Sequence, residues 1–137
     1  MIGILIVAHN EYAKALIDTS KMIYGEVENI EAVSFVHGEG LEILKNKILD
    51  KIKTINTSDG CIVLLDVFGG TPMNASVMAL GEREDVSFVY GTNISMLLEV
   101  LSRRESVGIR ELTEIAINAG KESIGSVKPR LFIENCE

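Results

Sequence analysis

A histidine and an aspartate each stand at the end of an apolar segment that has the composition of a buried strand. His9 comes directly after residues 2–8, IGILIVA, and Asp66 ends residues 61–66, CIVLLD. If these strands are neighbours in a parallel sheet, their ends bring the carboxylate within hydrogen-bond reach of the imidazole. A carboxylate that accepts from Nδ1–H fixes the ring tautomer and leaves the Nε2 lone pair as a nucleophile. The pair therefore predicts nucleophilic chemistry at His9, with Asp66 orienting the ring.

A glycine-rich loop follows Asp66 and leads into a predicted helix. Its sequence is FGGTPMN, residues 68–74, and we expect Thr71 at the N-cap and Pro72 at the first helical position. Glycines let the backbone come close to a ligand, and free N–H groups at a helix N-terminus bind anions. A well-capped helix after a tight turn is the simpler alternative. We expect the loop to hold a phosphoryl group through Phe68, Gly69, Gly70, Thr71 and Asn74.

Other polar residues carry a weaker signal. Gly91-Thr92-Asn93 ends a predicted strand and either lines the same site or forms a plain turn. His37 lies in a glycine-rich loop with no acidic partner in these motifs, so it receives no role. Four lysines of one predicted helix, Lys45, Lys47, Lys51 and Lys53, are interpreted as a solvated helix face.

The hydrophobic periodicity predicts how these residues are positioned. Strands and helices alternate as βαβαβαβααβ, which predicts a single α/β domain over residues 1–137 with a doubly wound, mostly parallel sheet. We expect the flavodoxin-like strand order 2-1-3-4. A short terminal strand from Arg130 to Asn135 is expected to be exchanged or shared in a dimer. Predicted strands cover 2–8, 30–36, 61–66, 86–90 and 130–135, and predicted helices cover 11–24, 41–55, 72–81, 94–104 and 109–120.

Composition excludes several classes of protein. The net charge is −7 with no stripe of basic residues, which argues against a nucleic-acid-binding protein. No apolar run approaches the roughly 20 residues of a membrane helix, and residues 2–8 are too short for a signal peptide. We therefore expect a cytoplasmic protein. The two histidines and two cysteines lack zinc-site spacing, and a cytoplasmic setting argues against a disulfide between Cys61, expected to be buried, and Cys136.

Three segments together resemble the IIA domain of the mannose family of the phosphoenolpyruvate-dependent phosphotransferase system. They are GILIVAHNEYAKAL, LLDVFGGTPMNAS and YGTNISMLLEVL, and the similarity spans essentially the whole chain. The resemblance implies that His9 is phosphorylated on Nε2, that Asp66 orients the ring, and that residues 69–71 help to hold the phosphate.

The resemblance also implies the partners. The phosphoryl group would come from HPr and pass to a histidine of a separate IIB component, for sugar uptake through the membrane components IIC and IID. Family members are dimers in which a terminal strand contributes to the contact. No nucleotide-binding motif is present, so no cofactor is expected.

Three other functions remain as alternatives. The phosphoryl-carrier subunit of a dihydroxyacetone kinase is close in kind. A response-regulator receiver domain shares the fold, but it needs an acidic cluster after the first strand, where this chain has Ala8-His9-Asn10. A flavin-binding module shares the fold too, but it needs aromatic rings around the flavin, and the chain has no tryptophan.

Overall fold

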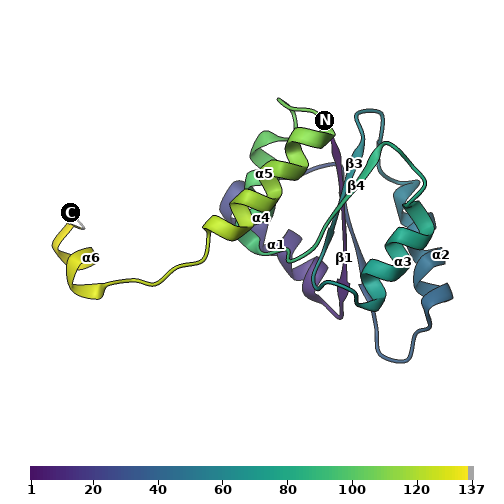
Figure 1. Ribbon diagram of the computed structural model, residues 1–137, viewed down its shortest axis with the longest axis horizontal. Coiled ribbons are helices and arrows are strands. Elements are labelled where there is room, and N and C mark those ends of the chain that lie inside the picture. Colours follow the sequence, from purple (N-terminus) through teal and green to yellow (C-terminus); the bar gives the residue numbers. More distant parts are fainter. Residues whose placement is uncertain (136–137) are drawn as a thin grey trace.

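The computed structural model describes residues 1–135, and a four-stranded parallel sheet forms its centre (Figure 1). The strand order β2-β1-β3-β4 confirms the expected order. A parallel strand must be reached by a crossover connection, and each crossover in this sheet contains a helix. The strands are β1 (Gly3–His9), β2 (Ile30–Phe35), β3 (Cys61–Leu65) and β4 (Val86–Val89).

Helices cover both faces of the sheet, which makes three layers (Figure 1). On one face lie α1 (Tyr12–Tyr24), α4 (Ile94–Arg103) and α5 (Ile109–Glu122). On the other face lie α2 (Leu41–Ile52) and α3 (Thr71–Leu80).

The central strand β1 shows why the sequence reads as a continuous apolar run. Successive side chains of a strand point to opposite faces. Ile4 and Ile6 pack in the core with α1 and α4, whereas Leu5 and Val7 pack in the core with α2 and α3. All four are fully buried, so both faces of β1 require apolar residues.

The register of the strands places the candidate residues at one edge of the sheet. Val7 pairs with Leu65, and His9 pairs with Phe35. His9 is therefore the last residue of β1, and Asp66 directly follows the neighbouring strand β3.

A buried arginine joins segments at the opposite end of the strands. Arg104 is 5% exposed, and its guanidinium donates hydrogen bonds to the main-chain oxygens of Ile2, Glu28 and Asn29. These contacts join the end of α4 to the segments that enter β1 and β2. Burial lowers the pKa of Arg104 from its usual value.

Helix boundaries differ from the predictions by a few residues. Gly70, not Thr71, is the N-cap of α3, and no side chain caps that helix. The predicted helix over 41–55 ends at Ile52, because the chain turns there. Ile55 nevertheless stays buried in the turn that follows, which explains why its spacing continues the apolar pattern.

The predicted terminal strand is wrong for the chain described here. Residues 129–135 form a short helix, α6 (Pro129–Asn135), beyond a segment that leads away from the three layers (Figure 1). A strand needs a neighbouring strand for its backbone hydrogen bonds, whereas a helix satisfies them locally, as the bond from Phe132 N–H to Lys128 O illustrates. Pro129 also suits a first helical turn. The apolar side chains of α6 are exposed.

Two further predictions concern the cysteines and the membrane. Cys61 is buried as predicted, and burial raises the pKa of its thiol to about 12. Cys136 lies outside the described residues. Within residues 1–135, no helix combines the length and the apolar character needed to cross a membrane.

Candidate functional site

His9 and Asp66 form the hydrogen-bonded pair that the sequence predicts. The His9 Nδ1 atom lies 2.7 Å from Asp66 Oδ2. The same oxygen accepts the backbone N–H of His9 at 2.8 Å, and Asp66 Oδ1 accepts the backbone N–H of Val67 at 2.9 Å. The carboxylate is thus held by three donors, two of them from His9.

The hydrogen bonds determine the direction in which the pKa of Asp66 shifts. Burial alone raises the pKa of Asp66, but the hydrogen bonds from His9 and Val67 outweigh it, so the pKa lies below its usual value. The ionised carboxylate faces Nδ1, and Nδ1 therefore carries the proton in the neutral ring. Nε2 is left with its lone pair. The His9 side chain is 46% exposed, whereas that of Asp66 is only 13% exposed.

Phe35 and the Gly70 backbone lie close to the imidazole. Phe35 meets the ring edge to face, with centroids 5.5 Å apart and an interplanar angle of 77°. On the loop side, a Cβ atom at Gly70 would lie only 3.2 Å from His9 Cε1 and 3.2 Å from Val67 Cγ2. Glycine at position 70 therefore lets the loop backbone approach the ring closely.

The loop between β3 and α3 presents unoccupied backbone donors. Within residues 1–135, no hydrogen bond occupies the N–H groups of Gly70, Thr71 and Met73. They surround the N-terminus of α3, where the helix dipole also favours an anion. Gly69 has φ +77°, a conformation that favours glycine, and its own N–H donates to Met73 Sδ at 3.2 Å. The loop thus has the features of an anion site next to a nucleophile.

Asn74 and Phe68, also expected to hold the phosphoryl group, make different contacts. The side-chain amide of Asn74 donates to Gly69 O at 3.4 Å, so Asn74 helps to hold the loop in shape. Phe68 is 70% exposed and packs against Tyr90, with ring centroids 5.0 Å apart. Its ring lies against an aromatic neighbour from the end of β4.

The turn after β4 supports Asp66 through its backbone. Gly91 N–H donates to Asp66 O at 2.9 Å, and Thr92 N–H donates to Leu65 O at 3.0 Å. The side chain of Asn93 caps α4 by accepting from Met96 N–H. This segment is therefore a supporting turn.

Within residues 1–135, the other residues singled out in the sequence form no hydrogen bond or ion pair with His9 or Asp66. His37 is exposed in the loop after β2. Three of the four lysines form ion pairs within the chain: Lys45 with Glu42 on the same helix, Lys47 with Glu39 of the preceding loop, and Lys51 with Glu31 of β2. In the part of the chain that the structure describes, no group of three or more His, Cys, Asp or Glu residues is arranged to hold a metal ion.

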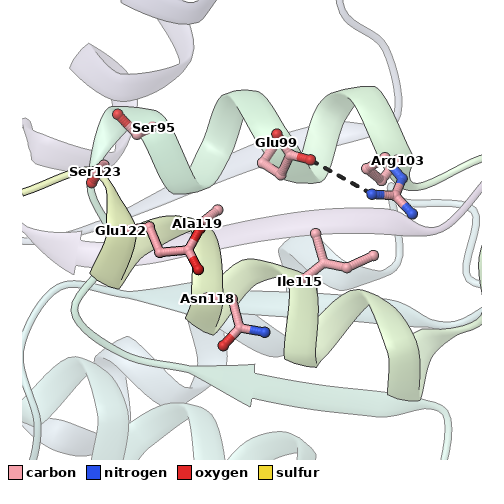
Figure 2. Close-up of a pocket in the computed structure, with 8 residues that line it drawn as sticks. All are labelled: Ser95, Glu99, Arg103, Ile115, Asn118, Ala119, Glu122 and Ser123. Atoms are coloured by element: carbon pink, nitrogen blue, oxygen red, sulfur yellow. Dashed lines mark ion pairs between the residues drawn. The ribbon is translucent and has the colours of Figure 1, made fainter.

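A separate pocket of about 520 Å³ lies between α4 and α5 (Figure 2). It contains none of the candidate residues, and the Glu99–Arg103 ion pair spans one side at 3.7 Å. Its lining residues are Ser95, Glu99, Arg103, Ile115, Asn118, Ala119, Glu122 and Ser123.

Sequence reasoning missed Phe35, which contacts the His9 ring, Tyr12, which binds the turn after β4, and Tyr90, which contacts Phe68 of the loop. Tyr12 begins α1, Phe35 ends β2 and Tyr90 follows β4, and the fold alone explains the patterns of these three elements. Their contacts with the site depend on partners far away in the chain, so no local signal identifies them.

Comparison with known proteins agrees with this geometry. Residues 3–117 match the model of the EIIA-man family, described as "PTS system fructose IIA component". The fructose-specific EIIA component of Bacillus subtilis (strain 168) is 38% identical over 112 residues, which cover 82% of this chain and 77% of the relative. The mannose-specific EIIAB component of Escherichia coli (strain K12) is 33% identical over 94% of this chain, which spans only 40% of that longer protein.

A solved structure shows the same fold. The mannose/sorbose-specific IIA subunit from Enterococcus faecalis superposes with a TM-score of 0.82 at 25% identity, covering 93% of this chain and 95% of that one. With the family model covering most of the sequence, the chain belongs to the EIIA-man family, the IIA phosphoryl carriers of the sugar phosphotransferase system.

Proposed function

We propose that His9 is the residue that carries the phosphoryl group. The hydrogen bond between His9 Nδ1 and Asp66 Oδ2 is the observation on which this proposal rests. It keeps the proton on Nδ1, so the lone pair of Nε2 is available for attack on phosphorus. A phosphoryl carrier requires a nucleophile, and a histidine whose ring is held in one orientation can act as one.

The proposed transfer proceeds by in-line displacement. The Nε2 lone pair forms a bond to phosphorus while the bond between phosphorus and its donor breaks, and the electron pair of that bond stays with the donor. The His9 ring gains positive charge, which the Asp66 carboxylate compensates. The free N–H groups of Gly70, Thr71 and Met73 bind the phosphoryl oxygens. Little more than positioning and charge stabilisation is needed for such a reaction.

The donor in this proposal is phospho-HPr, and the acceptor is a histidine of the IIB component. The relatives described above are named for fructose, mannose and sorbose, and we propose uptake of a sugar of this kind through membrane components IIC and IID. The sugar is recognised by those components. The protein would work in the cytoplasm as a single domain, residues 1–137, associated with the transporter only through its partners.

A homodimer is also part of the proposal. Leu131, Phe132 and Ile133 are between 54% and 71% exposed at the end of the chain. Exposed apolar clusters of this kind mark contact surfaces. One edge of β4 is unpaired within residues 1–135, and an apolar hollow of about 450 Å³ lies beside this strand. We propose that the apolar terminal residues pack against a second copy of the chain.

Phosphorylation in a reconstituted system tests the assignment of His9. The protein is incubated with labelled phosphoenolpyruvate, Enzyme I and HPr, and we expect one label per chain that is lost in acid and retained in alkali. The change His9→Ala abolishes labelling and lowers thermal stability only slightly, because the half-exposed ring buries little surface and the Asp66 carboxylate keeps the N–H donors of His9 and Val67. The change His37→Ala is the control and retains labelling. Full labelling of His9→Ala, or an alkali-labile label, would overturn the proposal.

A further inference from the structure

Tyr12 connects two parts of the site that are distant in the sequence. It is the first residue of α1, three positions after His9. Its hydroxyl donates to the backbone oxygen of Thr92 at 2.5 Å, across 80 positions of the chain. The ring is 39% exposed, so it lies at the surface of the site.

The segment that Tyr12 holds is the one that supports Asp66. The N–H groups of Gly91 and Thr92 donate to the backbone oxygens of Asp66 and Leu65. These two bonds hold the main-chain oxygens of Leu65 and Asp66 against the turn after β4. A displacement of this turn would move the carboxylate that orients the imidazole.

The Thr92 side chain does little to hold this turn through polar contacts. Thr92 is 3% exposed, and its Oγ1 atom has no hydrogen-bond partner within residues 1–135. The position of the turn therefore depends on its backbone bonds and on Asn93, whose side-chain amide donates to Gly120 O and to Ser123 Oγ, both at 3.3 Å. The bond from the Tyr12 hydroxyl joins the turn to α1.

The phenol is also suited to remain a donor. Burial and, to a smaller extent, the nearby Asp66 carboxylate raise the pKa of Tyr12 above its usual value. The hydroxyl thus keeps its proton throughout the pH range in which a histidine nucleophile works.

We infer that Tyr12 is a positioning residue for phosphoryl transfer, which acts by locking the turn after β4 against α1 and so fixing Asp66 beneath the His9 ring. The inference rests on the proposed role of His9. Tyr12 itself takes no part in bond making or breaking.

The chain offers a matched control on the same helix. Tyr24, the last residue of α1, donates its hydroxyl to the backbone oxygen of Leu101 at 3.2 Å. It is 46% exposed, close to the value for Tyr12, and it also joins α1 to a segment more than 70 positions away. It lies at the other end of α1, away from His9. Replacing either tyrosine by phenylalanine removes one hydroxyl and retains the ring.

The experiment compares Tyr12→Phe, Tyr24→Phe and the wild-type protein in single-turnover phosphorylation over a range of phospho-HPr concentrations. We expect the saturating rate constant of Tyr12→Phe to fall about fivefold to tenfold, the effect of one well-placed hydrogen bond. The half-saturating concentration stays within about twofold, because the phenol acts on the pair and not on the donor protein. Tyr24→Phe keeps both values.

Nitrogen NMR of the His9 ring adds a measurement that a merely structural role would not change. We expect the share of neutral ring protonated on Nδ1 to fall in Tyr12→Phe and to be unchanged in Tyr24→Phe. If Tyr12→Phe keeps the wild-type rate and tautomer while both variants lose similar thermal stability, Tyr12 is only a structural tie and the inference is wrong. If the wild-type protein is not phosphorylated on His9, the proposed function fails. The tautomer comparison then still decides whether Tyr12 sets the state of the ring.

Discussion

Replacing Asp66 by asparagine removes one charge at the centre of the site and changes little else in size. The carboxylate accepts three hydrogen bonds, two on Oδ2 from His9 and one on Oδ1 from Val67 N–H. An amide has only one oxygen. If this oxygen faces His9, the NH₂ group opposes Val67 N–H, and if it faces Val67, the NH₂ group opposes both His9 donors. At least one donor therefore loses its acceptor.

The size of the effect follows from these contacts. A hydrogen bond to a charged group contributes about 1.5–3 kcal/mol. Because about 1.4 kcal/mol corresponds to a tenfold change in rate, loss of this stabilisation as the ring gains charge slows phosphorylation by about 10- to 100-fold. An orienting aspartate in a hydrolase triad is worth about 10⁴-fold. We expect a smaller loss here, since phosphoryl transfer depends more on positioning.

The stability of Asp66→Asn should depend on pH in a defined direction. The pKa of Asp66 is net lowered in the folded chain, because the three donors outweigh the opposing effect of burial. Its charge therefore stabilises the fold above the unfolded pKa of about 4, and this contribution is lost as the pH falls through the lower folded pKa. At neutral pH we expect asparagine to reduce the free energy of unfolding by about 1–3 kcal/mol. Below about pH 4 the difference from wild type should narrow.

Rapid-quench phosphorylation by phospho-HPr and urea unfolding at several pH values measure the two effects. Asp85→Asn is the control, since Asp85 also has a lowered pKa and accepts two hydrogen bonds, from Arg83 at 2.9 and 2.7 Å. Asp85 directly precedes β4, so it lies at the opposite end of the strands from His9 and Asp66. We expect it to leave the phosphorylation rate unchanged. A wild-type rate in Asp66→Asn would show that Asp66 is structural only, and the account of the ring tautomer would be wrong.

Three further predictions concern assembly, reactivity and the opposite edge of the sheet. Removing all residues after Lys128 deletes the exposed apolar residues of α6, and light scattering of the shortened chain should show a weakened dimer. A full-length chain that is monomeric at micromolar concentration would refute the dimer. In a Cys136→Ser background, Cys61 should resist alkylation at pH 8 until the chain unfolds, because its pKa is raised to about 12, and rapid modification of the folded protein would contradict its burial. Arg104→Ala should lower the free energy of unfolding, measured in urea melts, by about 1–3 kcal/mol, because buried main-chain oxygens lose their donor. The phosphorylation rate should not change. An unchanged stability would show that water replaces the guanidinium.

The sheet and the central pair could be predicted because their signals are local. A buried parallel strand needs apolar residues on both faces, and a polar residue that ends such a run is conspicuous. His9 and Asp66 both have this position, and the strand order makes them neighbours. The fold alone does not separate a phosphoryl carrier from a receiver or flavin-binding protein, since all share it. The family match makes that distinction.

The parts that escaped prediction depend on distant partners or on fine geometry. Tyr12 shows no sign in the sequence of its bond to Thr92, and the contact of Phe35 with the imidazole depends on the strand register. The N-cap moved from Thr71 to Gly70 because Pro72 is compatible with either start. Residues 129–135 are apolar enough for a strand, but a strand must also lie beside a sheet edge, and the segment before α6 leads away from the sheet (Figure 1). In the single chain these residues form a helix instead.

The strand order also determines when during synthesis the site can exist. His9 leaves the ribosome early, but its partner Asp66 lies 57 positions later, and the tie from Tyr12 to Thr92 spans 80. Pairing of β1 with β3 is a contact of long sequence separation, which forms slowly compared with local structure. A nascent chain that has not yet reached β3 thus carries the histidine without the carboxylate that sets its tautomer. Such an unfinished chain should be a poor phosphoryl acceptor, so incomplete translation products would draw little phosphate away from finished molecules.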